Sequence, residues 1–449
     1  MTRSTLPVVR APPAPTTFGV VLDLRRLRSD PDAIRGGLSR RGADVAAVVD
    51  ELVATDVRQR ELGTQRDDIR ARIKVLSKDV GKLRGSGDAD GAEALMAESR
   101  ALGDQEKALD TEAEQLAATV HDLLLRTPNV PSDDAPDGAG EADNVVLRTE
   151  GYDPDAYGEH QRVPHWDFAT ELGLIDNERA VKISGSMFTM YKGWGARLLR
   201  GLVQLSLDRN HDAYTEVRPP TLVRTDTMVA TGHLPKFAED GYQIERDDLW
   251  AIPTAEVPLT SLHRDEVLDE AELPLRYMAY TSCFRREAGS AGRDTRGLLR
   301  SHEFDKVELF ALATGAEQAI ACQEDVLARS EAILRDLGLA YRVLDLCTGD
   351  LGASAARTWD IEAYAPGCDL WLEVSSVSWF ADYQARRASI RWKSAGGKGT
   401  EVCHTVNGSA MGWPRTIAAY LETHRQPDGS IAIVECLQPY LGGATRIPA

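Results

Sequence analysis

The chain has 449 residues, of which 43% are hydrophobic, and a formal net charge of −18 at pH 7. This length predicts about two or three domains with a buried core, and the acidic balance argues against nucleic-acid binding by the molecule as a whole. No apolar run reaches the length of a membrane span. The N-terminus also lacks the long apolar segment of a secretory signal, so we expect a cytoplasmic location.

Residues 1–18 are rich in proline and threonine and predict a disordered extension. Residues 19–130 predict a helical arm, because apolar residues recur there with the period of a left-handed coiled coil. The segment GSGD at 85–88 provides a turn between two limbs, which then run antiparallel as a helical hairpin. The expected seam consists of Leu62, Ile69, Ile73, Leu76, Val80 and Leu83 in the first limb and of Leu95, Leu102, Leu109, Leu116 and Leu123 in the second.

Charge is segregated between the two predicted limbs. Residues 58–84 carry nine Lys and Arg against four acidic residues, whereas residues 92–126 carry eight acidic residues against three basic ones. Ion pairs between the limbs would produce this pattern, and so would a basic surface for a phosphate backbone. The charge pattern alone leaves both interpretations open.

The proline-containing segment at 127–131 ends the second limb. Residues 131–158 are polar and acidic and predict a linker. From residue 159 to residue 449, strand-like runs alternate with helical segments without a regular βαβ rhythm, and the sequence contains no G-x-x-x-x-G-K-[ST] phosphate loop. We therefore expect an α+β domain on a largely antiparallel sheet flanked by helices. The six cysteines are scattered, which argues against a zinc knuckle or a disulfide framework.

The segment from Cys283 to Phe310 is the most informative part of the chain. Arginine offers a planar fork of donors that matches phosphate geometry. The pattern fits a polyphosphate site as well as a solvated charged hairpin, and the neighbouring motifs favour the first interpretation. Five arginines surround a glycine-containing turn at 289–297, namely Arg285, Arg286, Arg293, Arg296 and Arg300.

Two segments on either side of this loop carry carboxylates. The run IPTAEVP at 252–258 looks strand-like, which would place Thr254 and Glu256 on the same side of a strand. Glu308 is expected to end the strand that follows the arginine loop. Two such carboxylates would suit a ligand that has an ammonium group.

Two later segments add further polar groups. Residues 373–376 (EVSS) are expected in another strand, and HTVNGS at 404–409 precedes Arg415 and a predicted helix over 416–424. Asn and Ser side chains suit a ligand with a small hydroxyl, and the arginines suit a nucleotide partner.

Together these motifs resemble those of bacterial-type seryl-tRNA synthetases, a family of class II aminoacyl-tRNA synthetases. The resemblance implies a serine–tRNA ligase, with a tRNA-binding coiled-coil arm at 19–130 and a class II catalytic domain at 159–449. It runs from about residue 21 to residue 448 and rests on TAEVPLT at 254–260, RGLLRSHEFDKVEL at 296–309, CTGDLGASAARTWD at 347–360 and NGS at 407–409 followed by Arg415.

The resemblance implies an ATP site with two catalytic arginines. Arg285 would hold the α-phosphate and Arg415 the γ-phosphate, and Glu287 would lie near the adenine. The loop at 289–297 would touch ATP and the tRNA acceptor end. Glu373 and Ser376 match metal-binding positions of the family and would hold Mg²⁺. The further ATP-binding positions implied are Arg286, Ser301, Val374 and Ser375.

The resemblance also implies how serine is bound and activated. The carboxylate of L-serine attacks the α-phosphate of ATP without a protein nucleophile, and a tRNA hydroxyl then takes the seryl group. Positioning and charge stabilisation by arginines and Mg²⁺ lower the barrier. A pocket that hydrogen-bonds the serine hydroxyl helps to reject alanine. The implied serine-binding positions are Thr254, Ala255, Glu256, Arg285, Glu308, Asn407 and Ser409.

The resemblance extends to partners. The arm would lie against the long variable arm of tRNA(Ser) and read its shape, and the breadth of the family allows tRNA(Sec) as well. The first class II motif would be a helix over 195–209 and a strand that ends at Pro219. In the family this motif builds a homodimer interface.

Three places depart from the pattern of the family: Ser301, the segment VSWF at 377–380 and the segment AMGWP at 410–414. One interpretation is neutral change with compensating repacking. Alternatively, a specialised paralogue would have a reshaped pocket that resists an inhibitor or supplies seryl-tRNA to a biosynthetic enzyme. A third interpretation, a catalytically silent tRNA-binding relative, is disfavoured because Arg285 and Arg415 are present.

Overall fold

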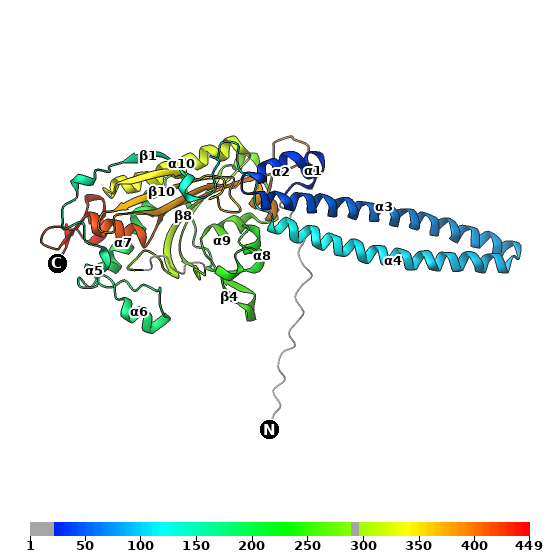
Figure 1. Ribbon diagram of the computed structural model, residues 1–449, viewed down its shortest axis with the longest axis horizontal. Helices are drawn as coiled ribbons and strands as arrows, with labels where there is room; N and C mark the ends of the chain where they lie inside the picture. Colours follow the sequence, from blue (N-terminus) through cyan, green and yellow to red (C-terminus); the bar gives the residue numbers. More distant parts are fainter. Residues whose placement is uncertain (1–21, 289–295) are drawn as a thin grey trace, which may run out of the picture.

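A computed structural model describes residues 22–288 and 296–449 of the chain. It has two parts: a domain built on a curved sheet, and a long helical hairpin that extends from one end of it (Figure 1). The predicted extension at 1–18 lies outside the described residues. Among those residues, no helix has the length and apolar character that a membrane crossing requires.

The hairpin consists of α3 (Ala43–Ser86) and α4 (Ala89–Arg126), antiparallel as predicted. Helix α3 ends at Ser86, and the C-cap residue Gly87 has φ of 85°, a left-handed conformation that favours glycine. Asp88 then caps α4, because its carboxylate accepts a hydrogen bond from Gly91 N at 2.9 Å. The GSGD segment is therefore the turn between the limbs.

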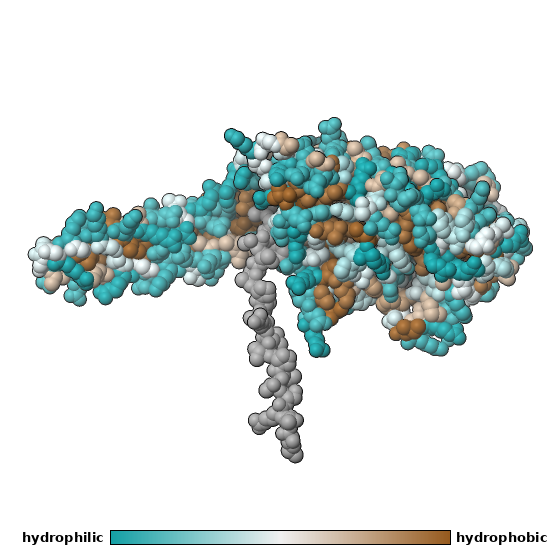
Figure 2. All heavy atoms as spheres, turned by 180° about the vertical axis from the view of Figure 1, so that it is seen from behind, coloured by the Kyte–Doolittle hydropathy of each residue, from teal (hydrophilic) through white to brown (hydrophobic). Residues whose placement is uncertain are grey.

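The predicted seam joins the two helices. Leu62 and Leu76 are buried, and the other seam positions are half-buried. Full burial of a leucine contributes about 1.5–3 kcal/mol, so these two residues contribute most to the pairing. The outer surface of the arm is mostly hydrophilic (Figure 2).

The basic limb pairs in part with the acidic limb. The pairs are surface pairs at N–O distances of 2.5 to 3.3 Å. Lys74 and Lys78 of the same limb are exposed, and neither has a carboxylate within ion-pair distance in the described part of the chain. The structure thus confirms ion pairs between the two limbs. Part of the basic charge of α3 is not paired and faces solvent. The pairs are Arg58–Glu112, Arg66–Asp110, Arg70–Glu106 and Arg72–Glu98.

The root of the arm is fixed to the domain by hydrogen bonds. The short helices α1 (Leu24–Ser29) and α2 (Pro31–Ser39) precede α3. Arg41 Nε donates to Asn129 O at 2.7 Å and Arg41 Nη1 to Gly352 O at 3.3 Å. Asn129 Nδ2 donates to Ser354 O at 2.9 Å. The arm is therefore tied to the 351–356 segment of the domain.

The domain contains an eight-stranded sheet in the order β1-β9-β10-β11-β14-β8-β7-β2. All neighbouring strands are antiparallel except β2 and β7, which confirms the predicted α+β class. Strand β1 lies inside the interval 131–158, so part of the expected linker belongs to the sheet. The bounds are β1 Val145–Glu150, β2 Thr215–Glu216, β7 Leu275–Phe284, β8 Glu303–Ala313, β9 Tyr341–Asp345, β10 Arg357–Ala365, β11 Leu370–Trp379 and β14 His404–Gly412.

The main core lies between this sheet and the helices α7 (Trp194–Asp208), α10 (Ala316–Asp336) and α12 (Arg415–Thr423). Along β14 the side chains alternate, because successive residues of a strand point to opposite faces. Val406 belongs to this core, whereas Asn407 lines a cavity on the other side. The helices α7 and α12 match the predicted helices over 195–209 and 416–424.

Shorter elements surround the sheet. The helices are α5 (His165–Phe168), α6 (Asn177–Ser184), α8 (Thr225–Ala230), α9 (Glu256–Thr260) and α11 (Tyr383–Arg387). The strands are β3 (Leu222–Arg224), β4 (Tyr242–Ile244), β5 (Leu249–Ala251), β6 (Val267–Asp269), β12 (Arg391–Lys393), β13 (Glu401–Val402), β15 (Ile431–Ala432) and β16 (Arg446–Ile447).

Two local predictions were wrong. The run at 252–258 is not a strand, because β5 ends at Ala251 and Glu256 begins α9. The Thr254 hydroxyl accepts a hydrogen bond from Glu256 N at 3.3 Å, and such a contact favours a helix start. Glu308 lies in the middle of β8 instead of at its end, because the apolar residues that follow continue to pair with β7 and β14.

Candidate active site

A cavity of about 500 Å³ opens on the face of the sheet opposite the main core. Two predicted site residues do not line it. Ala255 is fully buried in an apolar cluster with Phe310, and Arg286 lies outside the lining, where its backbone N–H donates to Asp240 O at 2.9 Å. The predicted residues that line the cavity are Thr254, Glu256, Arg285, Glu287, Ser301, Glu308, Glu373, Val374, Ser375, Ser376, Asn407, Ser409 and Arg415.

Glu308 lines the cavity with only 1% of its surface exposed. Its carboxylate forms an ion pair with Lys306 and accepts a hydrogen bond from Thr254 Oγ1 at 3.2 Å. Lys306 Nζ in turn donates to Thr254 Oγ1 at 2.7 Å. Burial raises the pKa of Glu308, and the positive charge of Lys306 opposes this shift. The group offers a buried carboxylate and a hydroxyl side by side.

Glu256 is the second buried carboxylate of the cavity. It accepts a hydrogen bond from Gln384 Nε2 at 2.5 Å. Burial raises the pKa of Glu256, against the positive charge of Lys306. Asn407 and Ser409 line the cavity from β14, on one face of the strand because they are two residues apart. This end of the cavity therefore suits a small ligand with an ammonium and a hydroxyl group.

Arg285 enters the cavity directly after β7. Its guanidinium lies 5.1 Å from the centre of the Phe304 ring, and Arg285 Nε donates to Pro253 O at 3.4 Å. Glu287 lines the same side and forms an ion pair with Arg300. A guanidinium beside an aromatic ring suits a ligand with an anionic and a planar part.

A bulge in β11 brings two oxygen-bearing side chains to one face. The register shifts between Ser375, which pairs with Ile361, and Glu373, which pairs with Glu362. In a regular strand, residues three apart point to opposite faces, and the extra residue at the bulge removes this difference. Glu373 and Ser376 both line the cavity.

Arg415 begins α12 and joins three elements of the cavity wall. Its Nε donates to Leu299 O at 3.1 Å, and its Nη1 donates to Glu373 O at 3.2 Å and lies 3.5 Å from Glu373 Oε2. The guanidinium thus lies between the end of the arginine-rich loop and β11. Residues 289–295 of that loop, including Arg293, lie outside the described residues.

The sequence analysis missed several residues at or beside the cavity, of which four are ionisable or amide side chains. Lys306 stands two residues before Glu308 on the same strand, so strand alternation could have revealed it. Asp360 pairs with Ser376 across β10 and β11, and burial followed by the charge of Glu373 raises its pKa. Gln384 comes from a distant helix and gave no sequence signal.

His233 is the fourth missed residue and also lines the cavity. Burial, reinforced by the positive charges of Arg285, Lys306 and Arg387, lowers the pKa of His233 to about 3. The imidazole is therefore neutral at physiological pH and adds no positive charge to that of Lys306.

Three residues from the places that depart from the family pattern, Ser301, Trp379 and Trp413, have different surroundings. The Ser301 hydroxyl donates to Glu303 O at 2.7 Å and is bound to backbone. Trp379 is absent from the cavity lining and stacks on His404, with ring centres 5.8 Å apart. Trp413 is 1% exposed and belongs both to the main core and to the cavity lining. Of the two tryptophans, only Trp413 therefore lines the cavity.

The fold and the two arginines define a class of enzyme. The family described as the tRNA synthetase class II core domain (G, H, P, S and T) matches residues 239–424, which include Arg285, Arg415 and most of the cavity. The antiparallel sheet with its cavity is thus that of a class II aminoacyl-tRNA synthetase.

Further comparisons narrow the class to one family. The seryl-tRNA synthetase N-terminal domain family matches residues 21–131. Serine–tRNA ligase of Exiguobacterium sibiricum is 45% identical over 426 residues, 94% of this chain and 99% of that protein. Serine–tRNA ligase of Pelotomaculum thermopropionicum is 46% identical over 429 residues, 95% of this chain and 100% of that protein.

The structure agrees with the sequence comparison. A crystal structure of seryl-tRNA synthetase from Pyrococcus horikoshii, complexed with ATP, superposes with a TM-score of 0.86 at 33% identity and covers 95% of this chain and 100% of that one. The chain therefore belongs to the seryl-tRNA synthetase family, whose reaction is the ligation of serine to tRNA. None of these comparisons supports the specialised or the silent alternative.

Proposed function

We propose that the cavity activates L-serine with ATP and that the arm presents tRNA to the activated product. The observation that carries this proposal is the meeting of two buried carboxylates, Glu256 and Glu308, with Arg285 and Arg415 in one cavity. The carboxylates suit an amino group, and the arginines suit phosphates. An amino acid and a nucleotide can therefore bind side by side.

Serine would bind at the end formed by Thr254, Glu256 and Glu308. A carboxylate would hold the ammonium, and Arg285 would hold the carboxylate of serine. Asn407 and Ser409 would contribute the remaining polar contacts. Alanine would leave buried polar groups of the pocket unpaired, which disfavours it, whereas the methyl group of threonine must be excluded by shape.

ATP would bind with its α-phosphate at Arg285 and its γ-phosphate at Arg415. Glu287 would lie near the adenine, and the Phe304 ring beside Arg285 offers a planar surface. The carboxylate of serine then attacks the α-phosphorus, and pyrophosphate leaves with the electrons of the broken P–O bond. The two arginines stabilise the negative charge that develops on the phosphates.

Glu373 and Ser376 would hold Mg²⁺, with Asp360 beside them. The fit rests on the bulge of β11, which puts both side chains on the cavity side, and on the preference of Mg²⁺ for oxygen ligands. When bound, the ion would neutralise charge on the phosphates. The position of Arg415 beside Glu373 would let both groups serve the same phosphate chain.

The arm would bind tRNA(Ser) through the basic face of α3. Lys74 and Lys78 are exposed and without a carboxylate in ion-pair distance among the described residues, so they remain available for phosphate contacts. Recognition of the tRNA shape in this way would also admit tRNA(Sec). Acylation that falls steeply with salt concentration would support these contacts.

We further propose a homodimer through α7 and its surroundings. The neighbouring helix α6 exposes two large apolar side chains, Ile183 at 75% and Val181 at 51%, and projects from the body of the domain (Figure 1). We expect these two side chains to lie in or beside the dimer interface. Size determination by light scattering should give a dimer that Ile183→Asp weakens, and a wild-type monomer would contradict this assembly.

Serine-dependent exchange between ATP and pyrophosphate tests the proposed activation step. The enzyme should exchange label with serine and far less with alanine, glycine or threonine. No exchange with any of the four would refute the activity, and preference for one of the other three would show that the pocket selects a different amino acid.

A further inference from the structure

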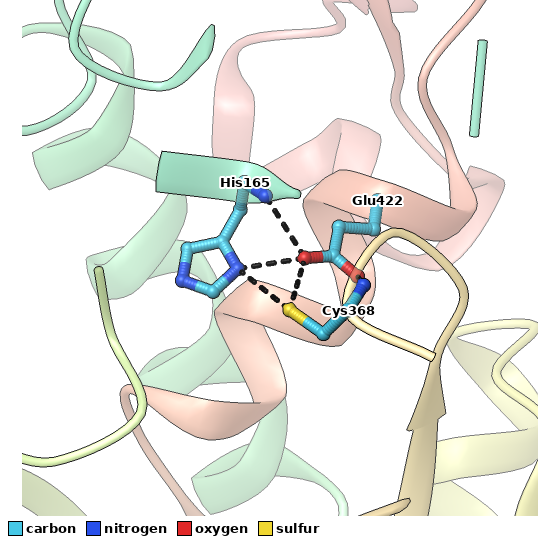
Figure 3. A group of neighbouring side chains, drawn as sticks. All are labelled: His165, Cys368 and Glu422. Atoms are coloured by element: carbon cyan, nitrogen blue, oxygen red, sulfur yellow. Dashed lines mark hydrogen bonds and ion pairs between the residues drawn. The ribbon is translucent and has the colours of Figure 1, made fainter. Parts of the chain in front are cut away.

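A cluster of three side chains lies in the core near one wall of the cavity. His165 begins α5, Cys368 lies in the turn between β10 and β11, and Glu422 lies at the end of α12. The three point toward one another (Figure 3). His165 and Glu422 are fully buried and 2.7 Å apart between Nδ1 and Oε1. None of the roles assigned above uses them.

Glu422 is surrounded by hydrogen-bond donors. Its Oε1 accepts from His165 N at 2.9 Å, from His165 Nδ1 at 2.7 Å and from Cys368 Sγ at 3.0 Å. Its Oε2 accepts from Gly367 N at 2.8 Å and from Cys368 N at 3.1 Å. Because the carboxylate is acceptor-only, the proton on its imidazole partner is at Nδ1. Three separate segments of the domain thus converge on one carboxylate.

The other nitrogen of His165 faces the arginine-rich loop. Leu298 N–H donates to His165 Nε2 at 2.9 Å. Nε2 must therefore carry a lone pair, and the ring is the neutral Nδ1–H tautomer. Gly297, which has φ of 58°, packs so close to the ring that a Cβ there would collide with it. The imidazole therefore fixes the position of the backbone at Gly297 and Leu298.

This point supports both ends of the proposed ATP site. Leu299 O, one residue along, accepts the hydrogen bond from Arg415 Nε at 3.1 Å. Arg300, the next residue, forms the ion pair with Glu287. Arg415 also begins the helix that carries Glu422, and a separation of seven residues puts both on one side of that helix. A shift of Leu298 would therefore move the partners of Arg415 and Glu287 together.

A metal ion is the competing explanation for three such side chains. A tetrahedral zinc ion with bonds of about 2.0–2.3 Å needs ligand atoms roughly 3.3–3.7 Å apart. Here Glu422 Oε1 lies 2.7 Å from His165 Nδ1 and 3.0 Å from Cys368 Sγ, which are hydrogen-bond distances. Both carboxylate oxygens are also held by backbone N–H groups. The geometry favours a hydrogen-bonded network over a metal centre.

We propose that His165 is a positioning residue for the ATP site. Glu422 fixes its tautomer and orientation, and its Nε2 holds Leu298 so that Arg415 and Glu287 face the nucleotide. The proposal rests on the proposed roles of Arg415 and Glu287 in ATP binding. It adds a residue that never touches substrate yet sets the geometry of two residues that do.

Two substitutions of His165 separate its two contacts. His165→Asn retains an N–H donor at the position of Nδ1 and removes the acceptor for Leu298. His165→Gln places a carbonyl oxygen near the position of Nε2 and restores that acceptor. Loss of one buried hydrogen bond corresponds to about a tenfold change. We expect His165→Asn to weaken binding of a non-hydrolysable ATP analogue about tenfold, and His165→Gln to recover most of that loss.

The readouts distinguish positioning from simple stability. In His165→Asn the KM for serine should stay within about twofold of wild type while the KM for ATP rises about tenfold. A merely structural role would lower the melting temperature and leave the ratio of the two KM values unchanged, and that result would overturn the proposal. So would equal ATP affinity of the Asn and Gln variants.

Cys368→Ser serves as the matched control. Cys368 Sγ lies 3.0 Å from Glu422 Oε1 and 3.8 Å from His165 Nδ1, and its replacement leaves the contact between His165 Nε2 and Leu298 in place. Its ATP affinity should equal that of wild type. Stoichiometric zinc in the purified protein, lost in Cys368→Ser, would overturn the hydrogen-bonded network. Binding of the ATP analogue does not depend on serine. A wild-type protein that binds the analogue but exchanges no label would therefore refute the activation step, and the role of His165 in ATP binding would still be tested by the affinities of its variants.

Discussion

The arm and the cavity both pair arginine or lysine with carboxylates, but in opposite surroundings. On the arm, Arg72 and Glu98 keep 53% and 42% of their side-chain surface exposed. In the cavity, Lys306 and Glu308 keep only 9% and 2%. Exposed ion pairs contribute about 0–1 kcal/mol to stability and are screened by salt. Buried charges cost desolvation free energy, and groups of this kind often occur at functional sites. The charge pairs of the arm thus lie at its surface, whereas those of the cavity are buried among the residues that we propose bind serine and ATP.

The largest expected effect is at Arg415. Removing an arginine that stabilises the negative charge on the leaving pyrophosphate should lower the rate by about 10²- to 10³-fold. Arg415→Ala should therefore abolish serine-dependent exchange, and Arg415→Lys should recover only part because it lacks the planar fork. Exchange rates measured at saturating ATP test this. Unchanged exchange in Arg415→Ala would remove Arg415 from the mechanism.

The next effect concerns Glu308. Glu308→Gln keeps the shape and hydrogen bonds but removes the charge that would face the ammonium of serine. A hydrogen bond to a charged group contributes about 1.5–3 kcal/mol, so the KM for serine should rise about 10- to 100-fold. The KM for ATP should change little. An equal rise in both would indicate that the substitution disturbs the whole cavity.

The pH dependence of serine activation should follow from the burial of the two glutamates in the cavity. Burial raises the pKa of Glu256 and of Glu308, and ionised carboxylates are needed to bind the ammonium. The kcat/KM for serine should therefore fall on the acidic side at a pH above the ordinary glutamate pKa of about 4.3. Because the raised pKa favours the protonated acid in the folded state, these groups contribute less stability as pH rises through it. A pH–rate profile with its acid limb at the ordinary value would contradict this assignment.

The smallest effects are expected on the stability of the arm. Leu76→Ala removes a residue that is 2% exposed and should destabilise the hairpin by about 2 kcal/mol or more. Arg72→Ala should change its stability by less than about 1 kcal/mol. Amide hydrogen exchange within α3 and α4 measures both. A larger effect for Arg72→Ala would mean that the surface pairs, and not the seam, hold the arm.

The two regions also differ in what the sequence could predict. The hairpin was predictable because its period, its GSGD turn and its charge segregation are local properties. The turn at Thr254 was not, because its hydroxyl accepts a hydrogen bond from Glu256 N, and this local contact competes with the strand-like composition of the run. Gln384 and His165 act only through distant partners, so no spacing revealed them.

The most direct test of separate roles for the arm and the cavity measures amino-acid activation and tRNA acylation in one variant. Lys74→Glu combined with Lys78→Glu reverses the unpaired charge of the arm and leaves the cavity unchanged. Exchange between ATP and pyrophosphate should stay within about twofold of wild type, while kcat/KM for tRNA should fall about 100-fold as phosphate contacts are lost. A parallel loss of both reactions, or no loss of tRNA acylation, would contradict the separate roles of arm and cavity.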